Sequence, residues 1–198
     1  FDRPLAIHMM ALLHAMGATA TAAHEGIPGL LGAILGYERA HWRKITEIKE
    51  RTNAETALHR ALAQVTAVMR IEESEAADAL VSADPLFKDM ADTDALSTRR
   101  HVDTLLPAPG IGLIGLEPDL IGEHHVAEKA DDRLVEACLS WASEDRDARR
   151  RILTVLNRAT RAEHGAMGDK ARATLNSAID LLSTEHTELG AAAAAIED

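Results

Sequence analysis

The residues best suited to chemistry are acid and histidine pairs on predicted helices. Glu38 and His41 form an E-x-x-H motif, whose two side chains share one helix face and which binds a metal pair in ferritin-like bundles. Such a site needs a second motif of the same spacing, and the sequence has none. The other pairs are spaced differently: Glu55 with His59, and Glu123 with His124. We therefore expect no metal site, and a metal-carboxylate enzyme is the least favoured of three function classes.

Glu38 is also notable because it falls within an apolar stripe, between Leu35 and Trp42. An acid among apolar residues must be paired or must lie at a contact between domains. We expect Glu38, His41 and Trp42 to form such an interdomain contact, with a basic or hydrogen-bonding partner for Glu38.

No residues of the chain indicate a catalytic site. Cys138 is the only cysteine, so it forms no internal disulfide, and its apolar neighbours predict a buried thiol in a reducing cytoplasm. His124 and His125 are adjacent, and their side chains diverge by about 100° on a helix. We expect them to be surface and core neighbours rather than ligands of one ion.

The formal net charge of -11 argues against nucleic-acid and membrane partners, because an acidic surface repels phosphates and anionic lipids. The basic run at 99–101 is the strongest nucleic-acid signal, but residues 92–129 hold seven acids against three bases. The stretch 4–23 lacks Asp, Glu, Lys and Arg, yet histidines, a glycine and threonines dilute it below the hydropathy of a membrane span. It predicts a buried core helix.

Composition predicts a mainly α-helical protein. The 198 residues are 46% apolar and 27% charged, which fits one globular domain or two small ones. Alanine occurs 37 times and aromatic residues make up only 3%, so small-residue packing between helices is expected and a β-sandwich is excluded.

Apolar spacing predicts three helices before residue 72. The first begins at Pro4 and ends near Gly17. The second follows the breakers at 24–29 and continues to about Arg51. The third has Asn53 as its predicted cap.

Shorter elements are predicted between residues 72 and 130. One helix precedes Asp84, and the next is capped by Ser97. The glycines and prolines of 107–118 exclude a helix and fit a small β-hairpin, and Asp119 caps the following helix. This order is that of a winged-helix module. After Ala130, three amphipathic helices with short linkers predict α-helical hairpins of the kind found in repeat arrays.

Three strings resemble STAND-class signalling NTPases, the class of NB-ARC and NACHT proteins, in their actinobacterial type. FDRPLAIHMMALL at 1–13 resembles the proline motif that packs on the nucleotide base, with Arg3 and Pro4 as the matching residues. ILGYERAHW at 34–42 resembles the connecting helix. LEPDLIGEHHVA at 116–127 falls where the family has its Met-His-Asp motif. Pro118 occupies the histidine position of that motif, and Asp119 the aspartate position.

The resemblance implies four regions: the end of a helical lid at 1–26, a connecting helix at 27–54, a winged helix at 55–130 and a repeat-like helical region at 131–198. It also implies nucleotide binding by Arg3, Pro4, Pro118 and Asp119, with ATP or ADP bound in the intact parent.

The chain has no G-x-x-x-x-G-K-[ST] string, so the chain alone is not expected to bind a cofactor or hydrolyse ATP. Its partners would be an upstream P-loop core, proteins that bind the helical region and, in the active state, further copies. The alternative function is a helical protein-binding or adaptor module without nucleotide dependence.

Overall fold

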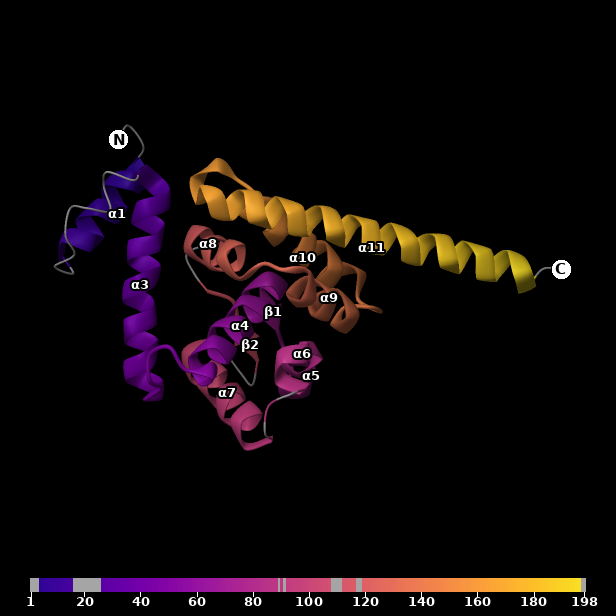
Figure 1. Cartoon of the computed structure of the whole chain (residues 1–198), viewed down its shortest axis with the longest axis horizontal. Helices are drawn as coiled ribbons and strands as arrows, with labels where there is room; N and C mark the ends of the chain where they lie inside the picture. The colour runs from indigo at the N-terminus through magenta and orange to yellow at the C-terminus, as the bar shows by residue number, and fades with distance from the viewer. Residues whose placement is uncertain are drawn as a thin grey trace.

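A computed structural model describes residues 4–15, 26–88, 90, 92–107, 112–116 and 119–196 of the chain. Ten α-helices and one two-stranded antiparallel sheet form this part of the protein, which is 81% helical (Figure 1). The prediction of a mainly α protein is confirmed. In the described part of the chain, no helix is long and apolar enough to cross a membrane.

The first two described helices pack side by side. Helix α1 (Pro4–Ala15) and helix α3 (Gly26–Thr46) share a small apolar cluster of buried residues: Met9, Leu13, Leu30, Leu31 and Ile34. Helix α3 ends at Thr46, so the prediction that it continues to Arg51 was wrong. The backbone turns at Glu47 and Arg51, which both have positive φ, before the next helix begins.

Helix α4 (Asn53–Val68) runs through the middle of the protein (Figure 1). Its N-cap is Thr52 rather than Asn53, because the Thr52 hydroxyl accepts a hydrogen bond from the Glu55 amide at 3.2 Å. All twelve residues from 57 to 68 except Arg60 are buried, and alanines on several sides allow close approach: Ala57, Ala61, Ala63 and Ala67. Helix α4 is therefore surrounded by other elements.

The sheet differs from the predicted local hairpin. Strand β2 (Leu113–Ile114) pairs antiparallel with strand β1 (Arg70–Ile71), which directly follows α4. Within the predicted hairpin, an antiparallel bridge joins Pro107 and Leu113, and the Ile114 amide donates to the Leu106 carbonyl at 3.2 Å. These contacts agree with a hairpin, but residues 108–111, which would form its turn, lie outside the described residues.

Three helices lie between the two strands: α5 (Ser74–Ala83), α6 (Pro85–Lys88) and α7 (Asp92–Leu105). Ser97 lies inside α7 and is not its cap. Helices α5 and α7 both pack on α4.

The second half of the chain forms four long elements. They are α8 (Asp119–Lys129), α9 (Asp132–Trp141), α10 (Arg146–Ala159) and α11 (Ala166–Ile196), with a short 3-10 helix (Ala162–His164) before α11. Asp131 caps α9 by accepting from the Leu134 amide at 2.8 Å. Asp145 caps α10 by accepting from two amides. The three helices predicted after Ala130 are confirmed.

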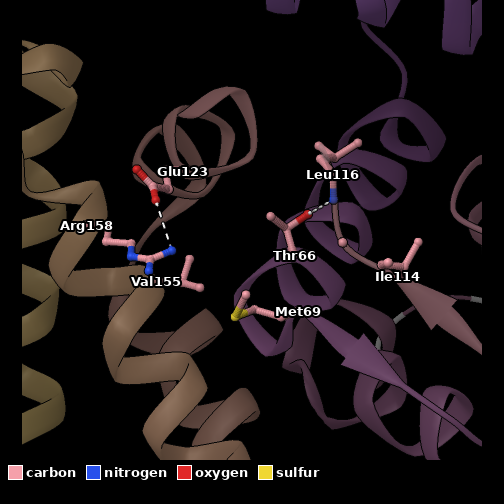
Figure 2. Close-up of a pocket in the computed structure, with 8 residues that line it drawn as sticks. Thr66, Met69, Ile114, Leu116, Glu123, Val155 and Arg158 are labelled. Atoms are coloured by element: carbon pink, nitrogen blue, oxygen red, sulfur yellow. Dashed lines mark hydrogen bonds and ion pairs between the residues drawn. The ribbon is translucent and has the colours of Figure 1, made fainter. Parts of the chain in front are cut away.

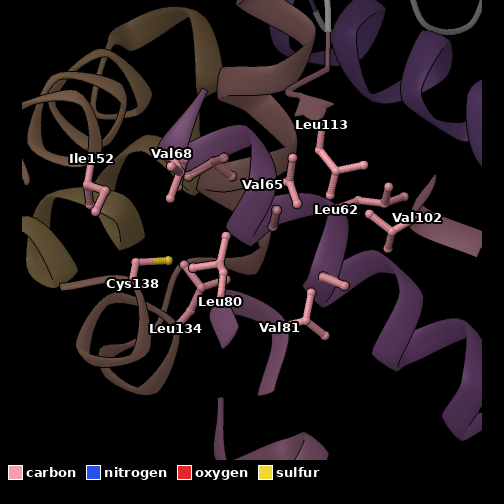
Figure 3. Close-up of a cluster of buried hydrophobic side chains, with 14 of the residues drawn as sticks. Leu62, Val65, Val68, Leu80, Val81, Val102, Leu113, Leu134, Cys138 and Ile152 are labelled. Atoms are coloured by element: carbon pink, nitrogen blue, oxygen red, sulfur yellow. The ribbon is translucent and has the colours of Figure 1, made fainter. Parts of the chain in front are cut away.

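The main core surrounds α4 (Figure 3). Leucine, valine and alanine side chains from α4, α5, α7, α9 and α10 fill it, together with Leu113 of β2. Cys138 is fully buried there, and burial raises the pKa of its thiol to about 12. The prediction of a buried thiol is confirmed.

Helix α8 packs closely on α4 at Gly122. A Cβ atom there would lie 2.6 Å from the Leu116 carbonyl oxygen and 2.9 Å from the Thr66 methyl. We predict that Gly122→Ala lowers the free energy of unfolding by about 1 to 3 kcal/mol, the usual cost of overpacking. Urea unfolding measures this change.

Gly36 of α3 is the matched control, because a Cβ atom there would meet nothing within 4 Å. Gly36→Ala should raise the free energy of unfolding by about 0.5 to 1 kcal/mol through helix propensity. Shifts of the same sign in both variants would contradict the close packing of α8 on α4.

Candidate functional site around helix α8

The four predicted nucleotide-binding residues lie at element starts or in undescribed parts of the chain. Pro4 is the first residue of α1 and Asp119 the first of α8, although their side chains are outside what is described. Arg3 and Pro118 lie outside the described residues. Nucleotide contact by these four residues stays a prediction.

The three predicted interdomain residues line one groove. Glu38, His41 and Trp42 of α3 face the end of α7 and the residues around β2, across a space of about 330 Å³. Trp42 is buried at 4% exposure, Glu38 is half-buried and His41 is exposed. Glu38 makes no hydrogen bond or ion pair with a described residue, so the partner expected for it is not found there.

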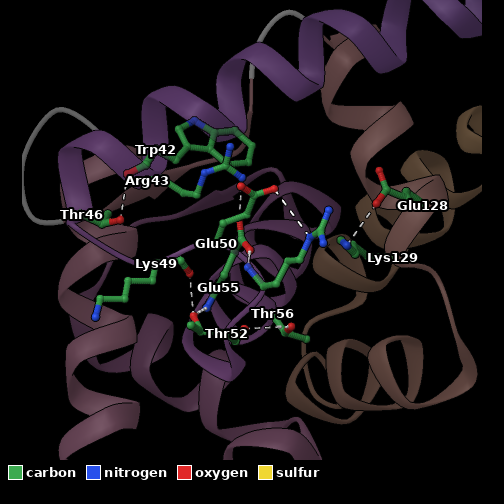
Figure 4. Close-up of polar contacts among 11 residues, drawn as sticks. Trp42, Arg43, Thr46, Lys49, Glu50, Thr52, Glu55, Thr56, Glu128 and Lys129 are labelled. Atoms are coloured by element: carbon green, nitrogen blue, oxygen red, sulfur yellow. Dashed lines mark hydrogen bonds and ion pairs between the residues drawn. The ribbon is translucent and has the colours of Figure 1, made fainter.

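Glu55 is instead the acid that ties α3 to α4 (Figure 4). Its carboxylate accepts from the Arg43 guanidinium at 2.8 Å and from the Arg51 amide at 2.5 Å. Burial alone would raise the pKa of Glu55, but these two hydrogen bonds lower it below its ordinary value. The carboxylate is therefore held ionised between the two helices.

Arg39 ties α3 to α8. Its guanidinium donates to the Glu128 carboxylate at 2.5 Å, and Lys129 lies 3.1 Å from the same carboxylate. Burial would raise the pKa of Glu128, but the hydrogen bond and charge of Arg39, reinforced by Lys129, lower it to about 2. Arg39 and Glu128 thus form a charged contact across 89 residues of sequence.

Three rings lie beside this ion pair. Trp42 of α3, His59 of α4 and His125 of α8 meet edge to face, with ring centroids 5.6 to 5.9 Å apart. The His125 Nε2 lies 2.9 Å from the His59 carbonyl oxygen, and its Nδ1 lies 3.4 Å from the Arg39 guanidinium. A neutral His125 that donates through Nε2 and accepts through Nδ1 satisfies both contacts.

A positive charge on the imidazole of His125 or His59 would be costly. Burial, together with the charges of Arg39 and His59, lowers the pKa of His125 to about 3. Burial, with Arg39 and Lys129 nearby, lowers the pKa of His59 to about 4. Both imidazoles are therefore neutral at physiological pH.

The other face of α8 carries a second polar cluster. The buried Glu123 carboxylate lies 3.7 Å from Arg158 of α10, 3.9 Å from Arg161 and 3.7 Å from the fully buried His164. The Nδ1 atoms of His124 and His164 are 3.4 Å apart. Burial, followed by the charge of His164, lowers the pKa of His124 to about 4. This cluster joins α8 to the helices after residue 130.

A small cavity of about 50 Å³ adjoins the second cluster (Figure 2). Glu123 and Arg158 border it on one side, and Thr66 of α4 and Leu116 on the other. The Thr66 hydroxyl accepts from the Leu116 amide at 3.2 Å. The cavity has room for ordered water beside the Glu123 carboxylate, but not for a metabolite.

His124 and His125 diverge as predicted and contact different neighbours. The expectation that they would be surface and core neighbours was wrong, because both are buried. Helix α8 is enclosed on two faces, so each imidazole finds its own buried partner: His164 for His124, and the His59 carbonyl for His125.

Two clusters of buried polar contacts hold α8 in place. Burial and the raised pKa keep the Cys138 thiol protonated and unreactive. Among the residues that the structure describes, no group of three or more histidine, cysteine, aspartate or glutamate side chains could hold a metal ion. Helix α8 is instead fixed by charged contacts to α3 on one face and to α10 on the other.

Sequence reasoning did not identify these contacts. Glu55 was visible as the acid of a T-x-x-E capping box starting at Thr52. Arg39 shares a helix face with Trp42, which is a weak signal. Glu123, Glu128 and His164 carried no signal, because their partners are distant in the sequence.

Comparisons with known proteins do not identify the chain: no protein-family model, no curated protein and no solved structure matches it.

Glu55 and Glu38 form a matched pair of acids at the α3 and α4 junction. We predict that Glu55→Ala lowers the free energy of unfolding by about 1 to 3 kcal/mol, because it leaves Arg43 and the Arg51 amide without their acceptor. Glu38→Ala should change it by less than about 0.5 kcal/mol, since no described residue loses a partner. Thermal or urea unfolding of both variants distinguishes the two residues. Equal losses of unfolding free energy in the two variants would contradict the conclusion that Glu55, and not Glu38, ties α3 to α4.

The buried histidines predict acid sensitivity. Their pKa values of about 3 for His125 and about 4 for His59 and His124 lie below the ordinary value of 6.5. The unfolded chain therefore binds more protons as pH falls below 6.5, so stability present at pH 7 is lost on acidification toward pH 4. Each histidine should contribute about 1 to 2 kcal/mol of that loss between about pH 7 and 5.

His125→Gln keeps a donor for the His59 carbonyl but does not titrate. Unfolding measured across this pH range should show a shallower loss of stability for His125→Gln than for the unmodified chain. If the free energy of unfolding falls with pH as steeply in His125→Gln as in the unmodified chain, the His125 imidazole is not buried in its neutral form.

Proposed function

We propose that the chain is the regulatory part of a nucleotide-switched signalling ATPase of the STAND class. In this proposal, residues 55–130 form a winged helix that closes over a nucleotide held by a P-loop core. Residues 1–26 end the helical lid, residues 27–54 connect it to the winged helix, and residues 131–198 begin a helical sensor or scaffold region.

The observation that carries the proposal is that residues of two STAND-like strings, at 1–13 and 116–127, lie in one apolar cluster. Met9 and Leu13 of the first string and Leu120 and Ile121 of the second pack in one apolar cluster with α3. The strings are more than a hundred residues apart in sequence, yet their helices α1 and α8 both pack on α3, and residues of both strings join the same apolar cluster. Pro4 and Asp119 begin these two helices.

The order of elements also supports a winged helix. Helix α4, strand β1, helices α5 and α7, strand β2 and helix α8 follow one another, and β1 pairs with β2. Helices α5 and α7 pack on α4, as the helices of such a module do. The bridge between Pro107 and Leu113 adds the beginning of a third strand.

Helix α8 would transmit the nucleotide state in this proposal. Its first residue, Asp119, would contact the nucleotide, while its later residues hold α3 through Glu128 and α10 through Glu123. A shift of α8 would change both contacts together, which is the coupling a two-state switch needs. Release of these contacts in the active state would allow further copies of the parent protein to associate in the cytoplasm.

We predict that the chain alone neither hydrolyses ATP nor binds it at micromolar concentration. Pro4 can supply only one wall of a pocket whose phosphate cradle is absent from the sequence. Titration calorimetry with ATP and ADP tests this. Micromolar binding by the chain alone would contradict the proposed dependence on a separate P-loop core.

The parent protein tests the switch directly. Its reading frame must encode a P-loop upstream of Phe1, and a parent without one overturns the proposal. In the parent, Asp119→Ala should speed release of a fluorescent ADP analogue by about fivefold, because about 1 kcal/mol shifts a balanced switch by that factor.

Asp145→Ala is the matched control, since Asp145 also begins a helix and accepts from two amides. It should cost about 1 kcal/mol of stability and leave ADP release unchanged. Equal release rates in the two variants would show that Asp119 acts only as part of a helix start.

The second candidate function is a helical protein-binding or adaptor module without nucleotide dependence. An arginine-lined hollow on α10, with an adjoining hollow bordered by Leu182 of α11, favours protein binding by this part of the chain.

A further inference from the structure

Helix α10 carries a basic exposed face in an acidic protein. Three of the seven residues that line a hollow on this face are arginines and one is an aspartate, although the whole chain has a net charge of -11. The residues of this face recur along one side of the helix and line a groove of about 760 Å³: Arg146, Asp147, Arg149, Arg150, Leu153, Thr154 and Asn157. We call this surface the basic groove.

The basic groove continues toward α11. Arg146 and Arg149 also line an adjoining hollow of about 490 Å³, which Leu182 of α11 and the turn at Ser143 and Glu144 complete. Figure 1 shows α11 running alongside α10 and continuing beyond it. The two hollows share Arg146 and Arg149, and Leu182 of α11 borders the second of them.

Two arginines of the basic groove are not used by the fold. Arg146 and Arg150 are exposed, and neither guanidinium makes a hydrogen bond or ion pair with a residue that the structure describes. By contrast, buried and half-buried arginines elsewhere are each paired with an acid: Arg39, Arg43, Arg60 and Arg99. Acids outnumber bases by 32 to 21 in the chain, yet these two neighbouring arginines have no acidic partner among its described residues. They are therefore free to form ion pairs with carboxylates of another molecule.

We propose that the basic groove binds an acidic amphipathic helix of a protein partner. Arg146 and Arg150 lie one helical turn apart and would pair with carboxylates at a matching spacing on the partner. Leu153 and Leu182 supply apolar contacts for the partner's leucine-like side chains. The groove thus offers both charge and apolar surface, as helix-binding grooves do.

The same features argue against nucleic acid. Leu153 and Leu182 are aliphatic, whereas single strands are bound largely by stacking on aromatic side chains. The proposal is independent of the nucleotide switch, because no residue of the basic groove takes part in the contacts of α8.

The test uses the chain itself and a short labelled peptide that forms an amphipathic helix, with leucines on one face and glutamates flanking them. Fluorescence anisotropy at physiological salt should detect saturable binding. A peptide of the same composition in scrambled order and a short duplex DNA should bind about tenfold more weakly or worse. Sedimentation velocity on the chain alone should show no association through the groove.

The variants isolate the two arginines. Arg146→Glu with Arg150→Glu should weaken peptide binding by about tenfold or more, and Arg146→Lys with Arg150→Lys should retain most of it. Arg100→Glu, at an exposed position on α7, should leave binding unchanged. Circular dichroism should show that all three variants fold, since these positions are exposed.

Four results would overturn the proposal. They are absence of peptide binding, equal binding of the scrambled peptide, tighter binding of the DNA, and self-association that the double Glu variant abolishes. The last result would show that a second copy of the chain, rather than a partner's acidic helix, occupies the groove.

Discussion

Satisfying the polar groups of one buried helix is the constraint on which the rest of the structure depends. Helix α4 is enclosed by α5, α7, α8, α9, α10 and the sheet, so its polar side chains and exposed carbonyls must find partners within the protein. Most find one on another element, while His59 Nε2 and Gln64 Oε1 have no hydrogen-bond partner among the described residues. Glu55 binds Arg43 of α3, the His59 carbonyl binds His125 of α8, Arg60 binds Asp84 and Asp131, Gln64 binds the Leu80 carbonyl, and Thr66 binds the Leu116 amide.

Arg60 shows how strongly these contacts specify the arrangement. Its guanidinium reaches Asp84, which follows α5, and makes two hydrogen bonds of 2.6 and 2.8 Å to Asp131, the cap of α9. One side chain of α4 therefore sets the end of one helix and the start of another. Removing a buried partner of this kind is costly, whereas apolar packing alone tolerates many alternative arrangements.

Helix α8 is the element through which this framework could carry a signal. It lies between two clusters whose charges are neutralised locally, Arg39 with Glu128 on one face and Glu123 with basic groups on the other. Interfaces of this kind have a few discrete arrangements rather than a continuous range, because a displaced charge loses its partner. The proposed switch uses this property.

Local elements were largely predictable from sequence, and contacts between them were not. The apolar spacing of 58–69 and of 152–159 indicated helices that α4 and α10 confirm, and the surroundings of Cys138 indicated its burial. Before α4 the chain turns, with Thr52 capping α4 and Glu55 accepting from the Arg51 amide, and a periodicity argument overlooks this signal for the early end of α3. The pairing of β1 with β2 joins residues more than forty positions apart, so no local pattern encodes it.

The acid at the α3 junction illustrates the same limit. Both Glu38 and Glu55 lie on helices with apolar stripes, and sequence reasoning selected Glu38 because it falls between Leu35 and Trp42 of such a stripe. Which of the two acids is paired depends on which one a basic residue can reach, and the turn at residues 47–52 sets that distance. Arg43 faces Glu55 across that turn, and Glu38 faces the groove instead.

Amide hydrogen exchange on the chain tests most directly whether α4 holds the fold together. If it does, the amides of α4 exchange most slowly of all and only by global unfolding, with a free energy of exchange equal to that of urea unfolding. Amides of α1 and of the end of α11 should exchange by local opening well before that. Exchange of α4 amides at a lower free energy than those of the α9 and α10 pair would contradict the claim.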